Sequence, residues 1–295
     1  MYSRAGLASL REVLRDNLKK YGFPFPLNKA ECHGWSDLPR SGRTLFYTSC
    51  MYQIATLTKS LSKFVGMADK LSAFGFLASK LLKPPKEDLE RASRVLNKMV
   101  KLLKASGVND LFYLYEDEPY SGAALLEMGY LDLFEEHAKS VYSFFKSRGI
   151  SRVITVDPHT HNALTRYREF VPGFDIEVLN VYEVIKEARA VTQEELTIHD
   201  SCLYSRFLGL RENYRGLMTK AGLRIREDFL MTGKDNAFCC GYPIEAVDRD
   251  LSERIAELRA KGLKSLANRA VVVCPMCYAQ LRDKVEVVDL MEVIE

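Results

Sequence analysis

The chain alternates short apolar runs with longer amphipathic stretches. Runs rich in β-branched and aromatic residues predict strands at residues 43–48, 110–115, 152–156, 174–179, 196–199, 270–273 and 285–289. Between them, apolar residues recur every three to four positions, which predicts helices at residues 54–83, 87–106, 123–146, 203–218 and 244–263. Strands that alternate with helices are typical of an α/β fold with short, mostly parallel sheets.

The second half of the chain repeats the first half. Three pairs of segments match, namely 49–52 with 201–204, 157–158 with 274–275, and 177–185 with 286–294. We therefore predict two pseudo-repeated α/β half-domains, at residues 42–190 and 191–295, which follow a lead-in segment at residues 1–41.

The amphipathic helix predicted at residues 54–83 is an insertion in the first half. Cys50 and Tyr120 lie 70 positions apart, whereas their counterparts Cys202 and Cys239 lie 37 apart. The polar side of this helix is basic, which fits either a solvated face of a core helix or a surface that docks on a membrane or a partner subunit. The candidate docking residues are Lys59, Lys63, Phe64, Lys70, Phe74 and Lys80.

Five of the seven cysteines lie in the last third of the chain. They are Cys202, the adjacent pair Cys239 and Cys240, and Cys274 and Cys277 in a CPMC segment. Between these groups lie 36 residues (203–238) and 33 residues (241–273). Such a pattern indicates a site rather than scattered core cysteines.

Disulfides, zinc and iron–sulfur ligation compete to explain this pattern. Disulfides need an oxidising compartment, and the opening residues lack the layout of a signal peptide. Zinc usually takes four ligands from two spaced pairs, and the side chains of adjacent cysteines diverge too far to serve one ion well. Two adjacent thiolates suit a multi-iron cluster better, because they reach different irons. We therefore favour an iron–sulfur cluster and keep zinc and a redox disulfide as alternatives.

Three residues beside the cysteines are candidates for supporting roles. Gly241 is expected to let the backbone approach a cluster closely, and Pro275 to fix the turn of the CPMC segment. His199 ends a predicted strand near Cys202, where it either tunes and protonates the site or is an ordinary polar residue at a strand end.

The first half keeps the frame of the repeat but lacks most of its thiols. At the positions of four cysteines it carries Tyr120, Ser121, Asp157 and Thr160, so only Cys50 remains. One thiolate cannot hold a cluster, and we interpret this half as a structural pseudo-domain.

Histidines leave a zinc site in the first half as an alternative. Such a site would combine Cys50 with Asp157, His159 or His161. Cys32 and His33 also lie next to each other, and we interpret them as part of a polar loop because no second pair lies nearby in the sequence.

The pattern C…CCG…CPxC resembles the cysteine-rich CCG domain. This domain occurs in heterodisulfide reductases, in iron–sulfur subunits of glycolate, lactate and glycerol-3-phosphate dehydrogenases, and in archaeal succinate dehydrogenases. The resemblance covers most of the chain, because those proteins carry the domain twice. It implies one [4Fe–4S] cluster, cubane or non-cubane, on the five cysteines, and it implies amphipathic helices that associate with the membrane.

Composition bounds the remaining classes of function. A formal charge of +3 is too small to indicate nucleic-acid binding, and no run of eighteen apolar residues predicts a spanning helix. No Gly-rich nucleotide fingerprint occurs, so a flavin is expected on another subunit. We expect a cytoplasmic protein, peripheral on the inner face of the cell membrane.

These observations lead to one main hypothesis and two alternatives. The main hypothesis is an electron-transfer subunit of a succinate dehydrogenase-like or related complex, which relays electrons from a flavoprotein through one cluster toward quinone, alongside other iron–sulfur subunits. The first alternative is a disulfide-reducing subunit of the heterodisulfide reductase type. The second is a zinc-bound structural subunit.

Overall fold

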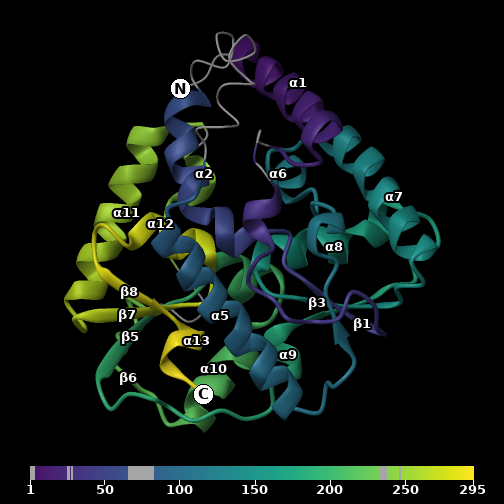
Figure 1. The fold of residues 1–295 in the computed structure, drawn as a ribbon. Coiled ribbons are helices and arrows are strands. Elements are labelled where there is room, and N and C mark those ends of the chain that lie inside the picture. The colour runs from purple at the N-terminus through teal and green to yellow at the C-terminus, as the bar shows by residue number, and fades with distance from the viewer. Residues whose placement is uncertain (1–3, 25–26, 28, 66–82, 233–237, 246) are drawn as a thin grey trace. The chain divides into compact units, whose positions relative to one another are not determined.

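Two four-stranded parallel sheets form the frame of the protein (Figure 1). The structure is a computed structural model that describes residues 4–24, 27, 29–65, 83–232, 238–245 and 247–295. The strand orders are β2-β1-β3-β4 and β6-β5-β7-β8. This confirms the predicted α/β fold of two repeated halves.

The first sheet takes its strands from the first half of the chain. They are β1 (Thr44–Tyr47), β2 (Leu111–Phe112), β3 (Arg152–Thr155) and β4 (Glu177–Asn180). The helices of this half are α1 (Arg4–Tyr21), η1 (Lys29–Cys32), α2 (Met51–Val65), α5 (Lys86–Ala105), η2 (Tyr115–Asp117), α6 (Ala123–Glu127), α7 (Leu131–Ser147), α8 (Pro158–Phe170) and α9 (Val181–Val184). Strand β1 is central and fully buried, and it pairs in parallel with β2 and β3.

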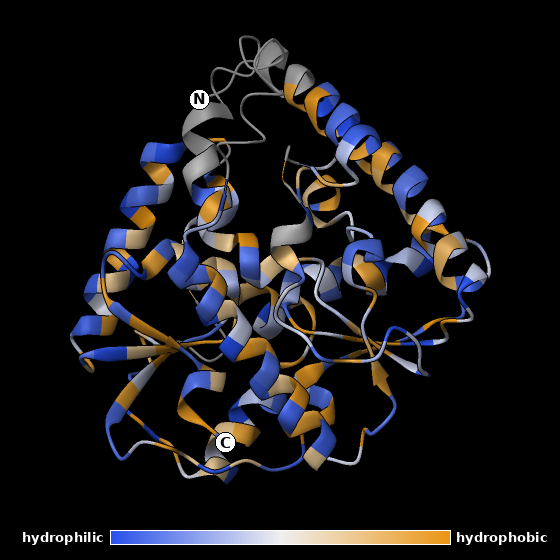
Figure 2. Cartoon of the chain, viewed as in Figure 1, coloured by the Kyte–Doolittle hydropathy of each residue, from blue (hydrophilic) through white to orange (hydrophobic). Residues whose placement is uncertain are grey.

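The second sheet repeats this arrangement. Its strands are β5 (Glu195–His199), β6 (Arg224–Ile225), β7 (Arg269–Val272) and β8 (Glu286–Asp289). Its helices are η3 (Leu203–Phe207), α10 (Arg211–Ala221), η4 (Tyr242–Ile244), α11 (Arg249–Lys264), α12 (Pro275–Leu281) and α13 (Leu290–Val293). Helix α11 packs against β5 and β7. Strands in both sheets are largely hydrophobic, whereas α1 and α11 are banded with polar and apolar residues (Figure 2).

The repeat extends to the ends of the elements. Strand β3 leads to Pro158 at the start of α8, and β7 leads to Pro275 at the start of α12. Proline suits a first helical position, where its missing N–H leaves no hydrogen bond unmade. Asn180 and Asp289 each begin a capping box at the end of the fourth strand.

Two compact units result, and they do not follow the order of the chain. One contains residues 1–90, 110–155 and 159–178, and the other contains 91–109, 156–158 and 179–295. Most of α5 therefore belongs to the second unit, where Arg91 pairs with Glu292 at 2.9 Å. We keep residues 42–190 and 191–295 as the predicted halves of the repeat.

Several predicted helices have other bounds. The helix predicted at 203–218 is a π-type turn, η3, followed by α10, with Gly209 in the left-handed region between them. The helix predicted at 244–263 starts only at residue 249, where the Asp248 side chain accepts a hydrogen bond from the Leu251 N–H. No helix among the described residues is long and apolar enough to cross a membrane.

Candidate metal centre

The five cysteines of the second half come from three places that meet at one end of the second sheet. Cys202 follows β5, and Cys274 lies between β7 and α12, with Cys277 on the first turn of α12. Cys239 and Cys240 lie in the loop before η4. The carboxyl ends of parallel strands gather on one edge of a sheet, which brings these distant segments together.

The five thiols form one connected series. Hydrogen bonds link Cys202 to Cys239, Cys239 to Cys240, Cys240 to Cys277, and Cys277 to Cys274. All five are free thiols; Cys240, Cys274 and Cys277 are buried, whereas Cys202 and Cys239 are half-buried. The structure therefore brings together every cysteine that the sequence singled out, with one side of the group reaching the surface.

Within this group of thiols, Cys239 is the one whose surroundings favour the charged form. Hydrogen bonds from Cys202 and Cys240, and from the Gly241 N–H at 3.3 Å, lower the pKa of Cys239. The hydrogen bond between Cys202 and Cys239 raises the pKa of Cys202. The pKa values of the Cys240 and Cys277 thiols are also raised. The surroundings of the other thiols therefore oppose their ionisation, and a metal cation among them would favour it.

Gly241 is required by crowding from helix α11. Its φ is +95°, and an added Cβ would lie 2.6 Å from the Ser252 main-chain oxygen and 3.2 Å from the Ile255 Cβ. Ser252 Oγ also donates a hydrogen bond to the Gly241 oxygen at 2.8 Å. The observed close approach is therefore to α11, while an approach of this backbone to a cluster stays a prediction, as does the role of Pro275.

His199 turns one ring nitrogen toward the thiols. The side chain is buried, and its Nδ1 accepts a hydrogen bond from Arg259 Nε at 2.9 Å. One ring nitrogen lies within 4.8 Å of the Cys240 and Cys277 sulfurs, and Nε2 has no hydrogen-bond partner among the described residues. Burial, with the nearby Arg259 charge, lowers the pKa of His199 to about 3, so the ring is neutral. Because Nδ1 accepts, the proton is on Nε2.

Arg259 brings a positive charge close to the same sulfurs. It is 5% exposed, and it donates to neutral groups: His199 Nδ1, the Met231 oxygen, and the Ile198 oxygen at 3.4 Å. Burial lowers the pKa of Arg259, and Asp200, Cys277 and Cys240 oppose that shift. Asp200 thus stabilises this buried guanidinium, and deprotonation of Cys277 or Cys240 would stabilise it further. Sequence reasoning missed this residue, which lies in mid-helix with no motif around it.

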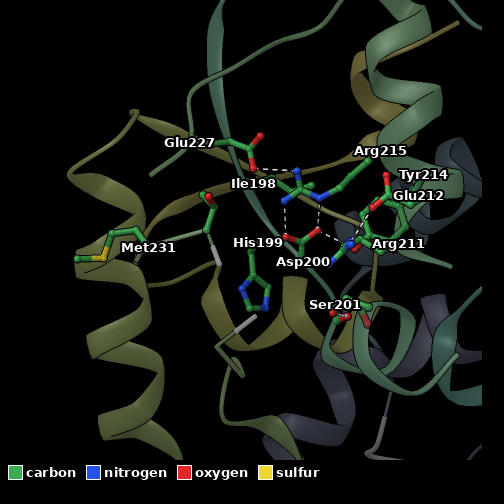
Figure 3. A network of polar contacts seen from close by, with 12 residues as sticks. Ile198, His199, Asp200, Ser201, Arg211, Glu212, Tyr214, Arg215, Glu227 and Met231 are labelled. Carbon is green, nitrogen blue, oxygen red and sulfur yellow. Dashed lines mark hydrogen bonds and ion pairs between the residues drawn. The ribbon is translucent and has the colours of Figure 1, made fainter. Parts of the chain in front are cut away.

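A second buried network supports the strand end at Asp200 (Figure 3). The Asp200 carboxylate is fully buried and accepts hydrogen bonds from the Tyr214 hydroxyl at 2.6 Å and from Arg215 at 2.6 and 3.0 Å. Arg215 also pairs with Glu227 at 2.8 Å. The His199 ring points away from this network. Consecutive residues therefore have separate tasks, since His199 faces the thiols and Asp200 anchors α10.

The candidate docking residues fall only partly within the described structure. Residues 51–55 of α2 are buried, and Lys59 is half-buried. Lys63 and Phe64 lie on α2, within its described backbone. Lys70, Phe74 and Lys80 lie outside the described residues, so the docking role of this segment stays a prediction.

In the first half, Cys50 meets residues that the sequence analysis assigned elsewhere. The interpretation of Cys32 and His33 as a polar loop is wrong: they are 1% and 5% exposed. Gln53 of α2 draws this segment inward, because its Nε2 donates a hydrogen bond to the Cys32 oxygen at 2.8 Å. Atoms of His33, Cys50 and Glu118 lie within 4.8 Å of one another.

The histidines proposed as partners of Cys50 bind other groups. His159 Nδ1 lies 2.7 Å from a Glu127 oxygen, and His161 Nδ1 lies 2.8 Å from the Thr155 hydroxyl. Among the described residues, neither histidine shares a potential metal-binding group of side chains with Cys50. Their positions in the sequence predicted only that they lie near the end of a strand. In the structure, the side chain of His159 turns toward α6 and that of His161 toward β3.

The comparisons agree with the motif. Residues 196–282 match a protein family described as a cysteine-rich domain, CCG. The second half contains a CCG domain. This confirms the resemblance drawn from the cysteine pattern. The match includes all five cysteines and His199, Asp200, Arg215 and Arg259.

Two curated relatives are named as oxidoreductases. The probable iron-sulfur-binding oxidoreductase FadF of Bacillus subtilis is 26% identical over 65% of this chain and 28% of its own length. The EtfAB:quinone oxidoreductase of Syntrophomonas wolfei is 28% identical over 69% of this chain and 30% of its own. The chain thus spans less than a third of each relative.

One solved structure shows only a distant likeness. Aspartate racemase of Picrophilus torridus aligns over 68% of this chain and 85% of its own, with 12% identity and a TM-score of 0.29. That likeness is too weak to bear on the function of this chain.

Proposed function

We propose that the chain is an iron–sulfur electron-transfer subunit of a membrane-associated oxidoreductase complex. The observation that carries the proposal is the connected series of five thiols in the CCG domain, with Arg259 and one ring nitrogen of His199 beside it. The names of both relatives, one an iron-sulfur-binding oxidoreductase and one acting between EtfAB and quinone, support the same class of function.

The donor set fits one iron–sulfur cluster, most simply a [4Fe–4S] cluster. Cys202, Cys239, Cys240, Cys274 and Cys277 would hold it, since thiolates are the ligands that such clusters take. When bound, a cluster of this kind accepts and releases single electrons. Only Cys50 of the first half occupies a matching position, so the proposal includes one cluster and not the paired clusters of a disulfide reductase.

The residues around the thiols would set the properties of the centre. The Gly241 N–H donates to the Cys239 sulfur, and one ring nitrogen of His199 lies within 4.8 Å of the Cys240 and Cys277 sulfurs. Arg259 places a positive charge at the same point. Hydrogen bonds and positive charge beside ligand sulfurs favour the reduced state, so these groups would raise the reduction potential.

The half-buried edge of the site offers a place for an electron donor. Phe207 and Phe238, which lie close in sequence to Cys202 and Cys239, are 72% and 57% exposed. A large exposed apolar side chain favours a protein contact over water. We place the flavoprotein partner at this edge and quinone further along the complex; the substrate of that flavoprotein is left open.

The proposed place of the chain is the cytoplasmic face of the cell membrane, with residues 54–83 as the docking segment. The basic pattern of that segment supports this. Binding to anionic vesicles should fall with added salt, because surface charge attraction is screened. Binding that requires a partner protein and not lipid would move the docking role of Lys59, Lys63 and Lys70 to a protein contact.

Anaerobic purification followed by metal analysis and electron paramagnetic resonance tests the cluster. We expect about four irons per chain and a signal that appears or disappears on reduction. In Arg259→Met the reduction potential should fall while the iron content stays. Zinc in place of iron on these cysteines, in protein that was never exposed to oxygen, would overturn the proposal.

A further inference from the structure

A second group of side chains that could hold a metal ion lies in the first half, outside residues 196–282. His33, Cys50 and Glu118 are 5%, 1% and 2% exposed, and one donor atom from each lies within 4.8 Å of the other two. Four-coordinate zinc, with bonds of about 2.0–2.3 Å, separates its ligand atoms by roughly 3.3–3.8 Å. Small side-chain rotations would therefore close this group on an ion.

His33 has one ring nitrogen without a hydrogen-bond partner among the described residues. This nitrogen is Nε2, whereas Nδ1 lies 2.6 Å from the Tyr113 hydroxyl. An unpaired buried polar atom costs about 1–3 kcal/mol, so such an atom calls for an explanation. A metal ion at Nε2 provides one, with Nδ1–H donating to Tyr113, as histidine ligands usually donate their second N–H.

The residue that follows strand β1, Thr48, fixes the position of Glu118 beside this group. Its carboxylate accepts hydrogen bonds from the Thr48 N–H and the Thr48 hydroxyl, each at 2.7 Å. The Tyr113 hydroxyl lies 3.5 Å from the same carboxylate, so one tyrosine connects two of the three groups. Burial raises the pKa of Glu118 to about 7, and a nearby cation would favour its charged form.

Cys32 supplies a second thiol. It forms a hydrogen bond with Cys50, and burial together with this bond raises the pKa of Cys50. Cys50 itself has a φ of +57°, in the left-handed region that non-glycine residues rarely adopt. Such strain persists where the surroundings hold a side chain in one direction, here toward Cys32 and His33.

We propose that Cys50, His33 and Glu118, completed by Cys32, bind one structural zinc ion. Thiolate, imidazole and carboxylate are the donor types that zinc takes, and hard cations such as Mg²⁺ avoid thiolates. Zinc binding would release the protons of both thiols, so two thiolates, one carboxylate and a neutral imidazole would form a closed, tetrahedral set with a net charge of −1. The ion would join the segment at residues 32–33 to strand β1 and to the loop that carries Glu118.

Metal analysis of the full chain, purified without chelators or oxygen, tests this site. We expect about one zinc per chain in addition to iron. His33→Gln should lose the zinc and keep the iron, whereas Cys274→Ser should lose the iron and keep the zinc. His161→Gln is the matched control, because His161 is an equally buried histidine of the same half and should keep both metals. Equal zinc in the wild type and His33→Gln would overturn the proposal.

Cobalt substitution keeps the test valid if a variant folds poorly. Zinc-free Cys274→Ser, loaded with Co²⁺, should show thiolate-to-cobalt charge-transfer bands and the intense visible bands of tetrahedral cobalt. Adding His33→Gln should abolish those bands. Their absence from folded Cys274→Ser would also overturn the zinc site, without affecting the iron-based function, which rests on the other five cysteines.

Discussion

Two strand ends, one in each half, carry the same short segment and have different surroundings. Strand β1 leads to Ser49-Cys50, and β5 leads to Ser201-Cys202. Cys202 meets the thiol of Cys239, whereas Cys50 meets Cys32, a residue from outside the repeated frame. The parallel sheet thus fixes where the first cysteine lies, and loops that differ between the halves decide which groups surround it.

The residues just before each cysteine show the same divergence. Asp200 is a fixed anion that Arg215 neutralises. Its counterpart Thr48 carries no charge and instead holds the carboxylate of Glu118. The backbone differs as well: φ is −60° at Cys202 and +57° at Cys50. One frame has therefore been adapted to two sets of donors, one rich in sulfur and one mixed.

Replacing one cysteine in each half with serine should give the largest effect, a change in metal content. Cys274→Ser should remove essentially all iron, because one buried ligand is lost from a set that must neutralise several irons. Cys50→Ser should keep the iron and lose zinc. Metal content per chain and visible absorption after anaerobic purification measure both results.

Loss of iron in Cys50→Ser would contradict the separation of the two sites. It would mean that the first half contributes to the cluster. Ser201→Ala, a change beside Cys202 that removes no thiol, is the control for general damage to the strand end and should keep both metals.

Breaking the ion pair between Asp200 and Arg215, near Cys202, should destabilise the second half. Arg215→Met leaves the fully buried Asp200 carboxylate with the Tyr214 hydroxyl as its remaining hydrogen-bond donor among the described side chains. Removing one partner of a buried pair costs about 3–5 kcal/mol, which equilibrium unfolding in urea would measure. The control Arg91→Met breaks a pair whose Glu292 is 22% exposed and hydrates more readily, so it should cost about 1 kcal/mol. Equal costs would mean that Asp200 needs no cation.

The sequence predicted the frame and the five cysteines because both depend on local patterns. Strand periodicity and the repeat require no knowledge of side-chain packing. Arg259 and Arg215 were missed because their partners His199 and Asp200 lie 60 and 15 positions away, on other elements. His33 was misassigned for a similar reason, since its surroundings depend on Tyr113, 80 positions later.

The bounds of helices were predicted less well than their existence. The periodicity at residues 203–218 continues through Gly209, but the chain turns there into the left-handed region and starts a new helix, α10. The turn at Gly209 therefore separates Cys202 and η3 from α10. A periodic pattern does not reveal such an interruption, because the apolar positions on both sides face the same core.

Acid should destabilise the first half through His161, just as it should destabilise the second half through His199, because burial lowers the pKa of both histidines. Burial lowers the pKa of His161 from 6.5 to about 4, and the matching position of the repeat is Tyr278, which carries no such base. A depressed pKa means that stability is full above pH 6.5 and falls as the pH drops toward 4. The loss approaches about 3 kcal/mol from this one group. Unfolding curves of the wild type and His161→Asn between pH 7 and pH 4 should converge, since the variant lacks the titration. An equal loss of stability in His161→Asn would assign the acid sensitivity to other groups.

The smallest effect separates the two matching glycines, Gly122 and Gly241. Both have positive φ, at +79° and +95°, so alanine costs about 1–2 kcal/mol in strain at either position. At Gly122 an added Cβ would lie 3.0 Å from the His137 side chain and 3.1 Å from the Phe134 side chain. At Gly241 it would lie 2.6 Å from the Ser252 main-chain oxygen. Side chains shift more easily than the backbone.

Gly241→Ala should therefore destabilise by about 1 kcal/mol more than Gly122→Ala, since overpacking against backbone is relieved less well. Thermal unfolding should show this as a midpoint lower by about 2 °C. Gly149→Ala, with a φ of +67° and nothing within 4 Å of its Cβ, measures strain alone. If all three variants shift equally, strain is the whole cost, and α11 does not restrict the loop that carries Cys239 and Cys240. A larger shift for Gly241 alone would show that α11 fixes this loop, and with it the positions of two of the five sulfurs.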